Sequence, residues 1–305
     1  MIDNGLKRVV VAGGSGLVGS RLVETLVRQG AQVTVLSRDP SRLELPSGAQ
    51  ARGYEDLVAV LDGVDAVINL AGASIAGKRW NEAYKRELVS SRVALTTQLV
   101  EAMDRCSTKP KVLVNASAIG FYGPHDGRRI TEADSNGKGF LPGLCAAWEK
   151  AADDALKIGI RVVKVRSGVV LTPTGGALAK LVFPVKFFQG AKLGSGQQGF
   201  SWVHIDDIVS LYIEAAKNPE WIGPINGTAP RPLTNETFTH LVGARLHRPI
   251  LPIPAFLTEM GVKILLGEMA SEVLEGAFVY PAQALKLGYA FKFEKAEDAL
   301  ADLLP

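Results

Sequence analysis

The stretch Val9-Val10-Val11-Ala12-Gly13-Gly14-Ser15-Gly16-Leu17-Val18-Gly19-Ser20 decides the fold of this chain. A short apolar run, a glycine-rich turn and apolar residues at helical spacing predict a buried strand that leads into a helix through a tight loop. Glycines at positions 13 and 16 let a phosphate approach the backbone, and the free N–H groups at the helix start would face that anion. Gly19 lets the helix pack closely against the strand. The stretch therefore predicts a dinucleotide site, and a turn that merely connects two elements is the alternative.

The end of the next strand selects the type of dinucleotide. Residues 32–39 predict the second strand of a βαβ unit, and Ser37 and Arg38 stand where a cofactor without a 2′-phosphate usually meets a carboxylate. A hydroxyl and a guanidinium bind a 2′-phosphate through charge-assisted hydrogen bonds, whereas a carboxylate repels it. The sequence thus favours NADP over NAD. In the alternative interpretation Arg38 is a solvated surface residue or pairs with Asp39.

Composition excludes several classes of protein. The chain has 305 residues, of which 47% are hydrophobic and 21% charged, so it can form one large α/β domain with a smaller lobe. A net charge of +3 gives no argument for binding nucleic acid or a membrane surface. The two cysteines, Cys106 and Cys145, lie in predicted helices and form neither a disulfide framework nor a metal site. The histidines show no metal-ligand spacing, and no apolar run is long enough to span a bilayer.

The N-terminal residues 1–7 lead directly into the first strand and resemble neither a signal peptide nor a transit peptide. Together with the cysteine usage, this predicts a reducing, cytoplasmic location, or an organelle stroma after removal of a targeting segment. We expect a small-molecule substrate, no nucleic-acid partner and no membrane span. The sequence leaves a protein partner open.

Strand-like and helix-like segments alternate through the first two thirds of the chain. The expected helices span residues 17–28, 81–104 and 144–157, and the expected strands between and after them include 65–70, 111–115 and 160–165. This alternation predicts an α/β fold of Rossmann type, with a doubly wound parallel sheet whose carboxyl edge binds ligands. We expect an NADP-binding Rossmann domain over residues 1–172, completed by parts of 200–230. An interleaved substrate-side lobe of mixed α/β structure would span 173–305, with a small C-terminal domain from about residue 249.

The last third of the chain has a different pattern. Residues 173–199 are rich in glycine and lysine, and residues 249–254 are proline-dense and therefore expected to be extended. Between them, Val203–Ile205 predicts a short strand, and Asp206 or Asp207 is the expected N-cap of the next helix. Two or three short helices are expected to complete the chain.

Four motifs in sequence order carry a family resemblance. They are Gly13-x-x-Gly16-x-x-Gly19, Asn69-Leu70-Ala71-Gly72, Ser117-Ala118-Ile119-Gly120-Phe121-Tyr122-Gly123 and Trp202-Val203-His204-Ile205-Asp206-Asp207. Their order and spacing resemble the extended short-chain dehydrogenase/reductase family, and more narrowly its epimerase-like subgroup, which is nucleotide-sugar epimerase-like and sometimes linked to cell division. Residues 252–256, 265–270 and 288–291 resemble the small C-terminal domain of that subgroup. The resemblance covers nearly the whole chain.

The resemblance implies a bound NADP(H), with a sugar nucleotide or equivalent ligand held between the lobes. It implies that Leu70 and Ala71 line the dinucleotide and that Glu87 and Arg92 face it, although without the family these two would be interpreted as a surface pair. The residues expected at the cofactor are Gly13, Ser15, Gly16, Leu17, Val18, Ser37, Arg38, Leu70, Ala71, Gly72, Glu87, Arg92, Ala116, Ser117, Val165, Arg166 and Ser167.

The chain departs from the family at its catalytic pair. Family members use Tyr-x-x-x-Lys on one helix face, where the lysine lowers the pKa of the tyrosine, and this chain contains no such motif. The best overlay places Cys145 at the tyrosine position and Glu149 at the lysine position. A glutamate would raise the pKa of a neighbouring phenol. Lys150 lies about 100° further round the helix and does not simply substitute.

The serine of the family mechanism is also displaced. Ser117 lies five residues before Tyr122, whereas the family norm is four, so Ala118 stands at the usual serine position. Ser117 and Tyr122 remain the candidate catalytic groups, and a packing role in the cleft wall is the alternative for Tyr122. Cys145 is expected to be a buried structural cysteine.

Two functions fit these residues. In the first, the chain is an oxidoreductase or epimerase that acts on a sugar nucleotide or another small carbonyl or alcohol, with its proton donor outside the usual pair. In the second, it is a non-catalytic NADPH-bound sensor or scaffold in cell or organelle division. Turnover with bound NADPH separates the two.

Overall fold

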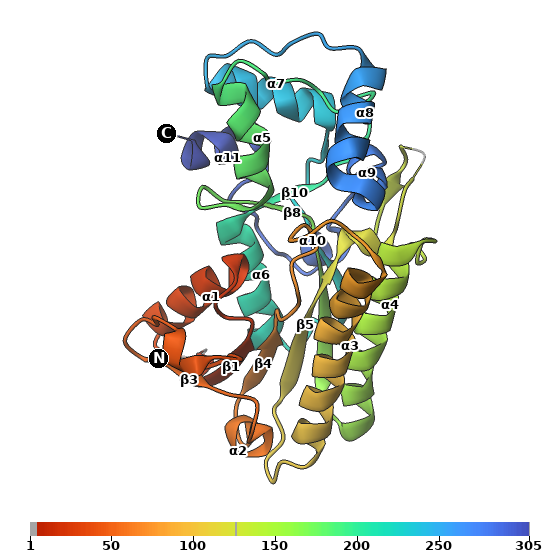
Figure 1. Cartoon of the computed structure of the whole chain (residues 1–305). Coiled ribbons are helices and arrows are strands. Elements are labelled where there is room, and N and C mark those ends of the chain that lie inside the picture. Colours follow the sequence, from red (N-terminus) through yellow and green to blue (C-terminus); the bar gives the residue numbers. More distant parts are fainter. Residues whose placement is uncertain (1–4, 126, 305) are drawn as a thin grey trace.

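The computed structural model describes residues 5–125 and 127–304. The expectation for the N-terminal residues 1–7 therefore falls partly on residues 1–4, which lie outside the described residues. Seven parallel strands form the central sheet in the order β11-β7-β5-β4-β1-β2-β3 (Figure 1). The strands are β1 (Arg8–Ala12), β2 (Gln32–Leu36), β3 (Ala49–Arg52), β4 (Ala66–Asn69), β5 (Val112–Ala118), β7 (Arg161–Ser167) and β11 (Gly223–Gly227). This is the predicted Rossmann-type sheet.

Helices cover both faces of the sheet because the strands are apolar on both faces. Alternate residues of β1 separate into two cores: Val9 and Val11 pack with α1 and α6, whereas Val10 and Ala12 pack with α2 and α3. The flanking helices are α1 (Leu17–Arg28), α2 (Leu57–Leu61), α3 (Glu82–Asp104), α4 (Phe140–Asp153) and α6 (Ile205–Lys217). The helix α1 begins and ends at the predicted residues.

Several predicted boundaries differ from the structure. The strand β5 continues to Ala118 and β7 to Ser167, so the motif residues at 116–118 and 165–167 belong to strands. The helix α4 begins at residue 140 and ends at 153, where a 3₁₀ turn (Asp154–Ile158) replaces its expected last turn. Cys106 follows the C-cap of α3 and does not lie in the helix, while both cysteines are buried as free thiols.

The remaining elements gather at the carboxyl edge of the sheet and beside it (Figure 1). They are β6 (Arg129–Ile130), β8 (Val169–Leu171), α5 (Gly176–Lys186), β9 (Gly199–Phe200), β10 (Trp202–His204), β12 (Leu233–Thr234), α7 (Asn235–Arg245), α8 (Ala255–Leu266), α9 (Ala270–Leu274), β13 (Phe278–Val279), α10 (Ala282–Lys286) and α11 (Ala296–Leu303), with 3₁₀ turns at 40–42, 119–121 and 267–269. The C-terminal region is thus more helical than predicted, and within the described residues no helix has the length and apolarity to cross a bilayer.

The N-cap of α6 also differs from the prediction. His204 caps this helix, because its Nδ1 accepts a hydrogen bond from the backbone N–H of Asp206 at 3.1 Å. Asp206 and Asp207 lie in the first turn, where a carboxylate faces the positive end of the helix dipole. An imidazole is an uncommon N-cap, so the sequence pattern favoured the aspartates.

Candidate cofactor-binding site

The glycine-rich turn joins β1 to α1 at the point where the strand order reverses, between β1 and β4. Gly13 has φ +78°, and a Cβ there would come within 2.8 Å of the backbone of Leu70 and Ala71. A Cβ on Gly19 would come within 2.2 Å of the carbonyl oxygen of Gly13. Glycine is therefore required at both positions by the approach of one backbone to another.

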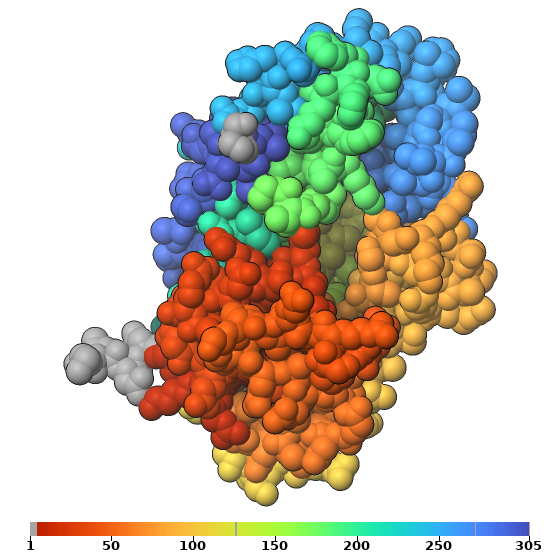
Figure 2. All heavy atoms as spheres, turned by 60° about the vertical axis from the view of Figure 1, so that its left-hand side comes forward, coloured from red at the N-terminus to blue at the C-terminus, as the bar shows by residue number. Residues whose placement is uncertain are grey.

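The outer side of the same turn is open. Ser15, Gly16 and Leu17 are exposed, and a Cβ on Gly16 would meet only the Gly13 carbonyl oxygen within 4 Å, at 3.3 Å. The first N–H groups of α1 have no partner inside the helix and point out of this end. Figure 2 shows a hollow between the red N-terminal segment, the green segment that includes α5 and the orange segment that leads into α3. The open turn, with its unpaired N–H groups, fits the pyrophosphate of a dinucleotide.

The end of β2 presents Ser37 and Arg38 at the same edge. The Ser37 hydroxyl accepts a hydrogen bond from the backbone N–H of Asp39 at 3.1 Å. The carboxylate of Asp39 pairs with Arg42 at 2.9 Å and not with Arg38. Arg38 is exposed and makes no ion pair with the described residues. Its guanidinium is therefore available to an anion in solution.

A buried amide fixes the loop that follows β4. Asn69 donates from Nδ2 to Thr96 Oγ1 at 2.9 Å and to Asn115 Oδ1 at 2.7 Å, while its Oδ1 accepts from the Ala71 N–H at 3.2 Å. The Thr96 hydroxyl also accepts from Trp148 Nε1 at 3.0 Å. This network ties β4, β5, α3 and α4 together and holds the backbone of residues 70–72 beside the Gly13 turn.

Arg92 is a buried cation beside that loop. Its Nη2 donates to the Ala73 carbonyl at 2.9 Å, and its guanidinium lies 5.2 Å from the ring centre of Trp148. No carboxylate among the described residues pairs with it, and burial lowers its pKa. Glu87 is not its partner, because Glu87 pairs with Lys78 at 3.3 Å. A Cβ on Gly72 would come within 2.8 Å of the Arg92 guanidinium carbon, so this charge lies directly against the loop.

The positions of the missing catalytic pair belong to a buried ion-pair network. Glu149 on α4 accepts hydrogen bonds from the Ser117 hydroxyl at 2.7 Å and from Arg166 Nε and Nη2, each at 2.8 Å. Both charged side chains are almost completely buried, with 5% of Arg166 and 6% of Glu149 exposed. The bidentate geometry compensates for part of the cost of removing two charges from water.

Tyr122 belongs to the same network and is fully buried. Its hydroxyl donates to Asn226 Oδ1 at 2.7 Å and accepts from Arg166 Nη1 at 2.9 Å. Burial raises the pKa of this hydroxyl to about 12, which outweighs the lowering effect of Arg166. Burial and the Glu149 charge raise the pKa of the Cys145 thiol to about 12. The geometry thus favours packing roles for both side chains.

The other expected residues of the nicotinamide half lie in register on two neighbouring strands. Ala116 is opposite Val165, Ser117 is opposite Arg166, and Ala118 is opposite Ser167. Ala116 and Val165 are buried in the core. The structure therefore brings the glycine turn, the end of β2, the loop after β4 and the ends of β5 and β7 to one edge.

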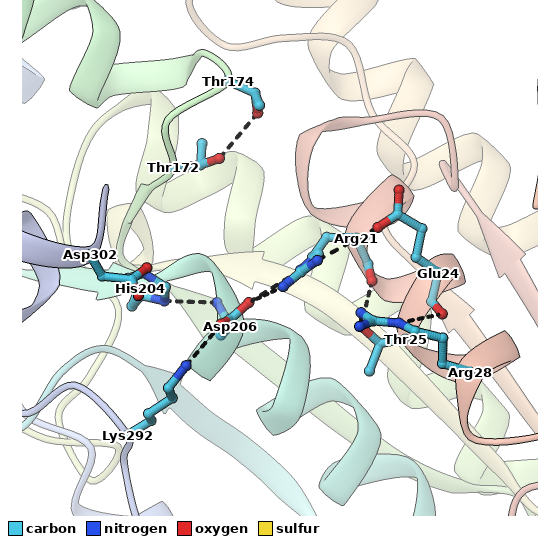
Figure 3. Close-up of polar contacts among 10 residues, drawn as sticks. All are labelled: Arg21, Glu24, Thr25, Arg28, Thr172, Thr174, His204, Asp206, Lys292 and Asp302. Carbon is cyan, nitrogen blue, oxygen red and sulfur yellow. Dashed lines mark hydrogen bonds and ion pairs between the residues drawn. The ribbon is translucent and has the colours of Figure 1, made fainter. Parts of the chain in front are cut away.

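A second polar network connects α1 to the C-terminal segment (Figure 3). Asp206 accepts from Arg21 Nη2 at 2.9 Å and lies 3.4 Å from Lys292 Nζ. His204 Nε2 lies 3.2 Å from the Asp302 carboxylate, and burial lowers the pKa of His204 despite the nearby aspartates. The helix that begins at the glycine turn is thus braced against residues near the end of the chain.

The sequence analysis did not predict the network around Asn69 or the network around Glu149, although the first of them left a signal in the sequence. Asn69 and Asn115 each interrupt an otherwise apolar strand, and such a residue is buried only when it is hydrogen-bonded. The Glu149–Arg166 pair had no signal in the spacing of residues, because its partners lie on different elements 17 positions apart.

The comparisons with known proteins concern the family of the chain and its fold. Residues 9–141 match the model of the NAD-dependent epimerase/dehydratase family, and residues 253–303 match a domain of unknown function, DUF1731. The chloroplastic epimerase family protein SDR39U1 homolog of Arabidopsis thaliana is 39% identical over 97% of this chain and 86% of its own length. An epimerase family protein of Staphylococcus aureus is 34% identical over 98% of this chain and 99% of its own length.

Solved structures extend the likeness to the whole fold. The human epimerase family protein SDR39U1, solved with NADPH, is 33% identical and has a TM-score of 0.86 over 97% of this chain and 98% of that chain. A nucleoside-diphosphate sugar epimerase from Corynebacterium glutamicum is 31% identical, with a TM-score of 0.79 over 99% of this chain but 59% of that chain.

Proposed function

Because the chain belongs to the NAD-dependent epimerase/dehydratase family, we propose that it binds NADP(H) along the carboxyl edge of its sheet, with the 2′-phosphate at Ser37 and Arg38. The observation that carries this proposal is the exposed Arg38 guanidinium, which has no carboxylate partner among the described residues. Asp39, the nearest carboxylate in sequence, is held by Arg42. The human relative solved with NADPH supports the same cofactor.

The rest of the cofactor follows from the order of the strands. The N–H groups at the start of α1, from Leu17 on, would hold the pyrophosphate, and residues 70–72 would line it from β4. Arg92 supplies a buried positive charge behind residue 72, which suits a ligand with several phosphates. Glu87 is exposed and paired with Lys78, and it is a further proposed contact. The ends of β5 and β7, at Ala116, Ser117 and residues 165–167, would border the nicotinamide half.

We further propose that the protein holds NADPH without the proton relay of the family. NADPH supplies a hydride when it is bound, and reduction of a carbonyl also requires a proton donor. The Ser117 hydroxyl donates to Glu149, the Tyr122 hydroxyl donates to Asn226, and the Cys145 thiol is buried. The two hydroxyl protons are thus donated to acceptors within the protein and not to a substrate. This favours the role of an NADPH-bound sensor or scaffold.

Catalysis is the second candidate function. The 31% identity to a nucleoside-diphosphate sugar epimerase favours oxidoreductase or epimerase chemistry on a sugar nucleotide or another small carbonyl or alcohol. The proton would then come from a group outside the Ser117–Tyr122 motif.

Isothermal titration calorimetry of the full chain with NADPH and with NADH tests the proposal. A charged hydrogen bond contributes about 1.5–3 kcal/mol, so NADPH should bind at least about tenfold more tightly than NADH. Equal affinities, or tighter binding of NADH, would overturn the assignment of the 2′-phosphate to Ser37 and Arg38.

A further inference from the structure

The exposed apolar side chains of the described residues gather in two segments of the second half of the chain. Nine of the thirteen large apolar side chains that are exposed lie between residues 183 and 188 and between residues 251 and 265. Together they form the apolar face: Phe183, Phe187, Phe188, Leu251, Phe256, Leu257, Met260, Ile264 and Leu265. Val262 is the only buried residue of α8. A monomer rarely leaves this much apolar surface uncovered, so the apolar face has the character of an interaction site.

The two segments are neighbours in the folded chain. The backbone N–H of Leu251 donates to the carbonyl oxygen of Gly190 at 2.7 Å, and the guanidinium carbon of Arg248 lies 4.5 Å from the ring centre of Phe188. The residues after α5 therefore lie beside the residues before α8. Both helices belong to the end of the molecule opposite to α2, and the green and blue segments that contain them adjoin on one side (Figures 1 and 2).

Cations without an ion-pair partner accompany the apolar face. Four cations of these segments make no ion pair with any described residue: Lys180, Lys186, Arg248 and Lys263. Residues 176–194 contain no aspartate or glutamate, and residues 245–266 contain only Glu259. The small overall charge of +3 thus conceals an excess of positive charge at this end of the molecule. Lysine stems can extend along apolar side chains while their ammonium groups stay in water.

The backbone at the edge of the apolar face is strained. Phe188 and His247 have φ of +60° and +53°, and they are the non-glycine residues with positive φ in the described part of the chain. They follow the ends of α5 and α7, and Phe188 contacts Arg248, the residue after His247. This region of φ is unfavourable for a bulky side chain, and such strain concentrates at functional sites. The exposure of the Phe188 ring is therefore attributed to a partner that it contacts.

The charge selects the kind of partner. Two copies of this chain in contact through the apolar face would bring their unpaired cations together, which is unfavourable, and lysine is depleted in protein interfaces. An anionic lipid surface accepts apolar side chains at the boundary between headgroups and acyl chains and attracts the surrounding lysines. The apolar face and its cations thus complement such a surface better than they complement one another.

We propose that α5 and α8 bind the protein to the surface of a membrane that contains anionic lipids. The apolar face lies at the headgroup boundary, and the four unpaired cations contact lipid phosphates. The contact is peripheral, because both helices lie on the surface. It is independent of the proposed cofactor site, which uses none of these residues.

Co-sedimentation of the full chain with lipid vesicles tests the proposal. Phosphatidylcholine vesicles are compared with vesicles that also contain about 30% phosphatidylglycerol, which supplies negative charge. We expect the protein to bind the second kind and not the first. Phe183→Ser/Phe187→Ser removes two exposed rings and should weaken this binding about tenfold or more. Leu156→Ser/Ile222→Ser removes two exposed apolar side chains outside the apolar face and should bind as the wild type does.

The variant Lys180→Gln/Lys186→Gln tests the contribution of charge. Each lysine near an anionic surface raises the affinity about fivefold, so the loss of two should weaken binding roughly 25-fold. Absence of binding to the anionic vesicles, or equal binding to both kinds of vesicle, would overturn the proposal. Sedimentation equilibrium gives a further outcome. A wild-type dimer that Phe183→Ser/Phe187→Ser dissociates would show that a second copy covers the apolar face, and this would also overturn the proposal.

Discussion

Arg38 and Gly13 are the two single residues on which the proposed binding of the adenosine half depends. Arg38 is an exposed cation whose neighbouring carboxylate is already paired with Arg42. Gly13 is confined by the backbone of Leu70 and Ala71. In the proposal, the first residue contacts the ligand directly, whereas the second lets the glycine turn lie against the backbone that follows β4. Substitutions at the two kinds of position should therefore have different consequences.

Arg38→Ala should weaken NADPH binding about tenfold or more and leave NADH binding nearly unchanged, because only NADPH carries the phosphate that the guanidinium would contact. Calorimetric titration of both cofactors measures this difference. Arg105→Ala, at the exposed C-cap of α3, removes the same charge away from the site and serves as the control. If Arg38→Ala weakens both cofactors equally, Arg38 does not contact a 2′-phosphate.

Gly16→Val should impair NADPH binding and leave the fold intact, whereas Gly19→Ala should destabilise the fold itself. A side chain on Gly16 enters the open space in front of the turn, so Gly16→Val should fold and lose the NADPH-dependent rise in melting temperature. A Cβ on Gly19 meets the Gly13 carbonyl at 2.2 Å, so Gly19→Ala should lower the melting temperature without any ligand. Thermal unfolding with and without NADPH distinguishes them. A full NADPH-dependent rise in Gly16→Val would show that the phosphates bind elsewhere.

The sequence could predict residues whose chemistry is local and could not predict long-range partners. The positions of Arg38 after β2 and of the glycine turn before α1 follow from residues within a few positions of each. The hydrogen bond between Tyr122 and Asn226 joins residues 104 positions apart, and only the folded chain shows it. That contact and the complete burial of Tyr122 favour a packing role over that of a proton donor.

At the scale of elements, α6 depends on an unusual cap. Because His204 Nδ1 accepts from the Asp206 N–H, the ring must be neutral there, with its proton on Nε2 toward Asp302. Burial lowers the pKa of His204, and a protonated ring would lose the cap. The charges around the ring are Asp206, Asp207 and Asp302, so they limit the shift but do not reverse it.

His204→Asn should therefore make stability less dependent on pH. The unfolded chain binds the His204 proton at higher pH than the folded chain does, so this residue's contribution is complete above about pH 6.5 and is lost as the pH falls through its lowered pKa. Asparagine keeps a capping oxygen but does not titrate in this range. Melting temperatures at several values between pH 7.5 and pH 5 should fall less steeply in the variant. A parallel decline in both proteins would mean that other groups account for the pH dependence.

Whether a segment forms a helix or a strand was predictable, because hydrophobic periodicity and the placement of glycines determine it. The residues at which each element ends were predicted less accurately. The helix α1 was predicted correctly at both ends, since a glycine turn precedes it and Gly30 follows it. The strands β5 and β7 extend beyond their apolar runs because Ser117 and Arg166 pair across the two strands and bond to the same carboxylate. Such tertiary contacts carry no periodic signal.

At the scale of the whole molecule, the proposed phosphate-binding residues and the positions of the family's catalytic pair lie on opposite halves of the sheet. The β2 side carries the exposed Arg38, where we propose that the cofactor phosphate binds, whereas the β5 and β7 side carries a buried network of hydrogen bonds around Glu149. The alternation of strands and helices predicted a doubly wound parallel sheet with its ligand edge at the carboxyl ends of the strands, and the structure adds the strand order with its switch point between β1 and β4. It could not predict that the catalytic positions of the family would become part of the core.

The most direct test of the account is the rate of NADPH oxidation by the saturated protein across a broad panel of aldehydes, ketones and nucleotide sugars. General acid–base help contributes about 10²–10⁴-fold, so without the relay we predict rates at or near the background without protein. Tyr122→Phe and Glu149→Gln should then leave any residual rate nearly unchanged. Vigorous wild-type turnover that falls about a hundredfold in either variant would contradict the account, because it would show that the buried network supplies the missing proton.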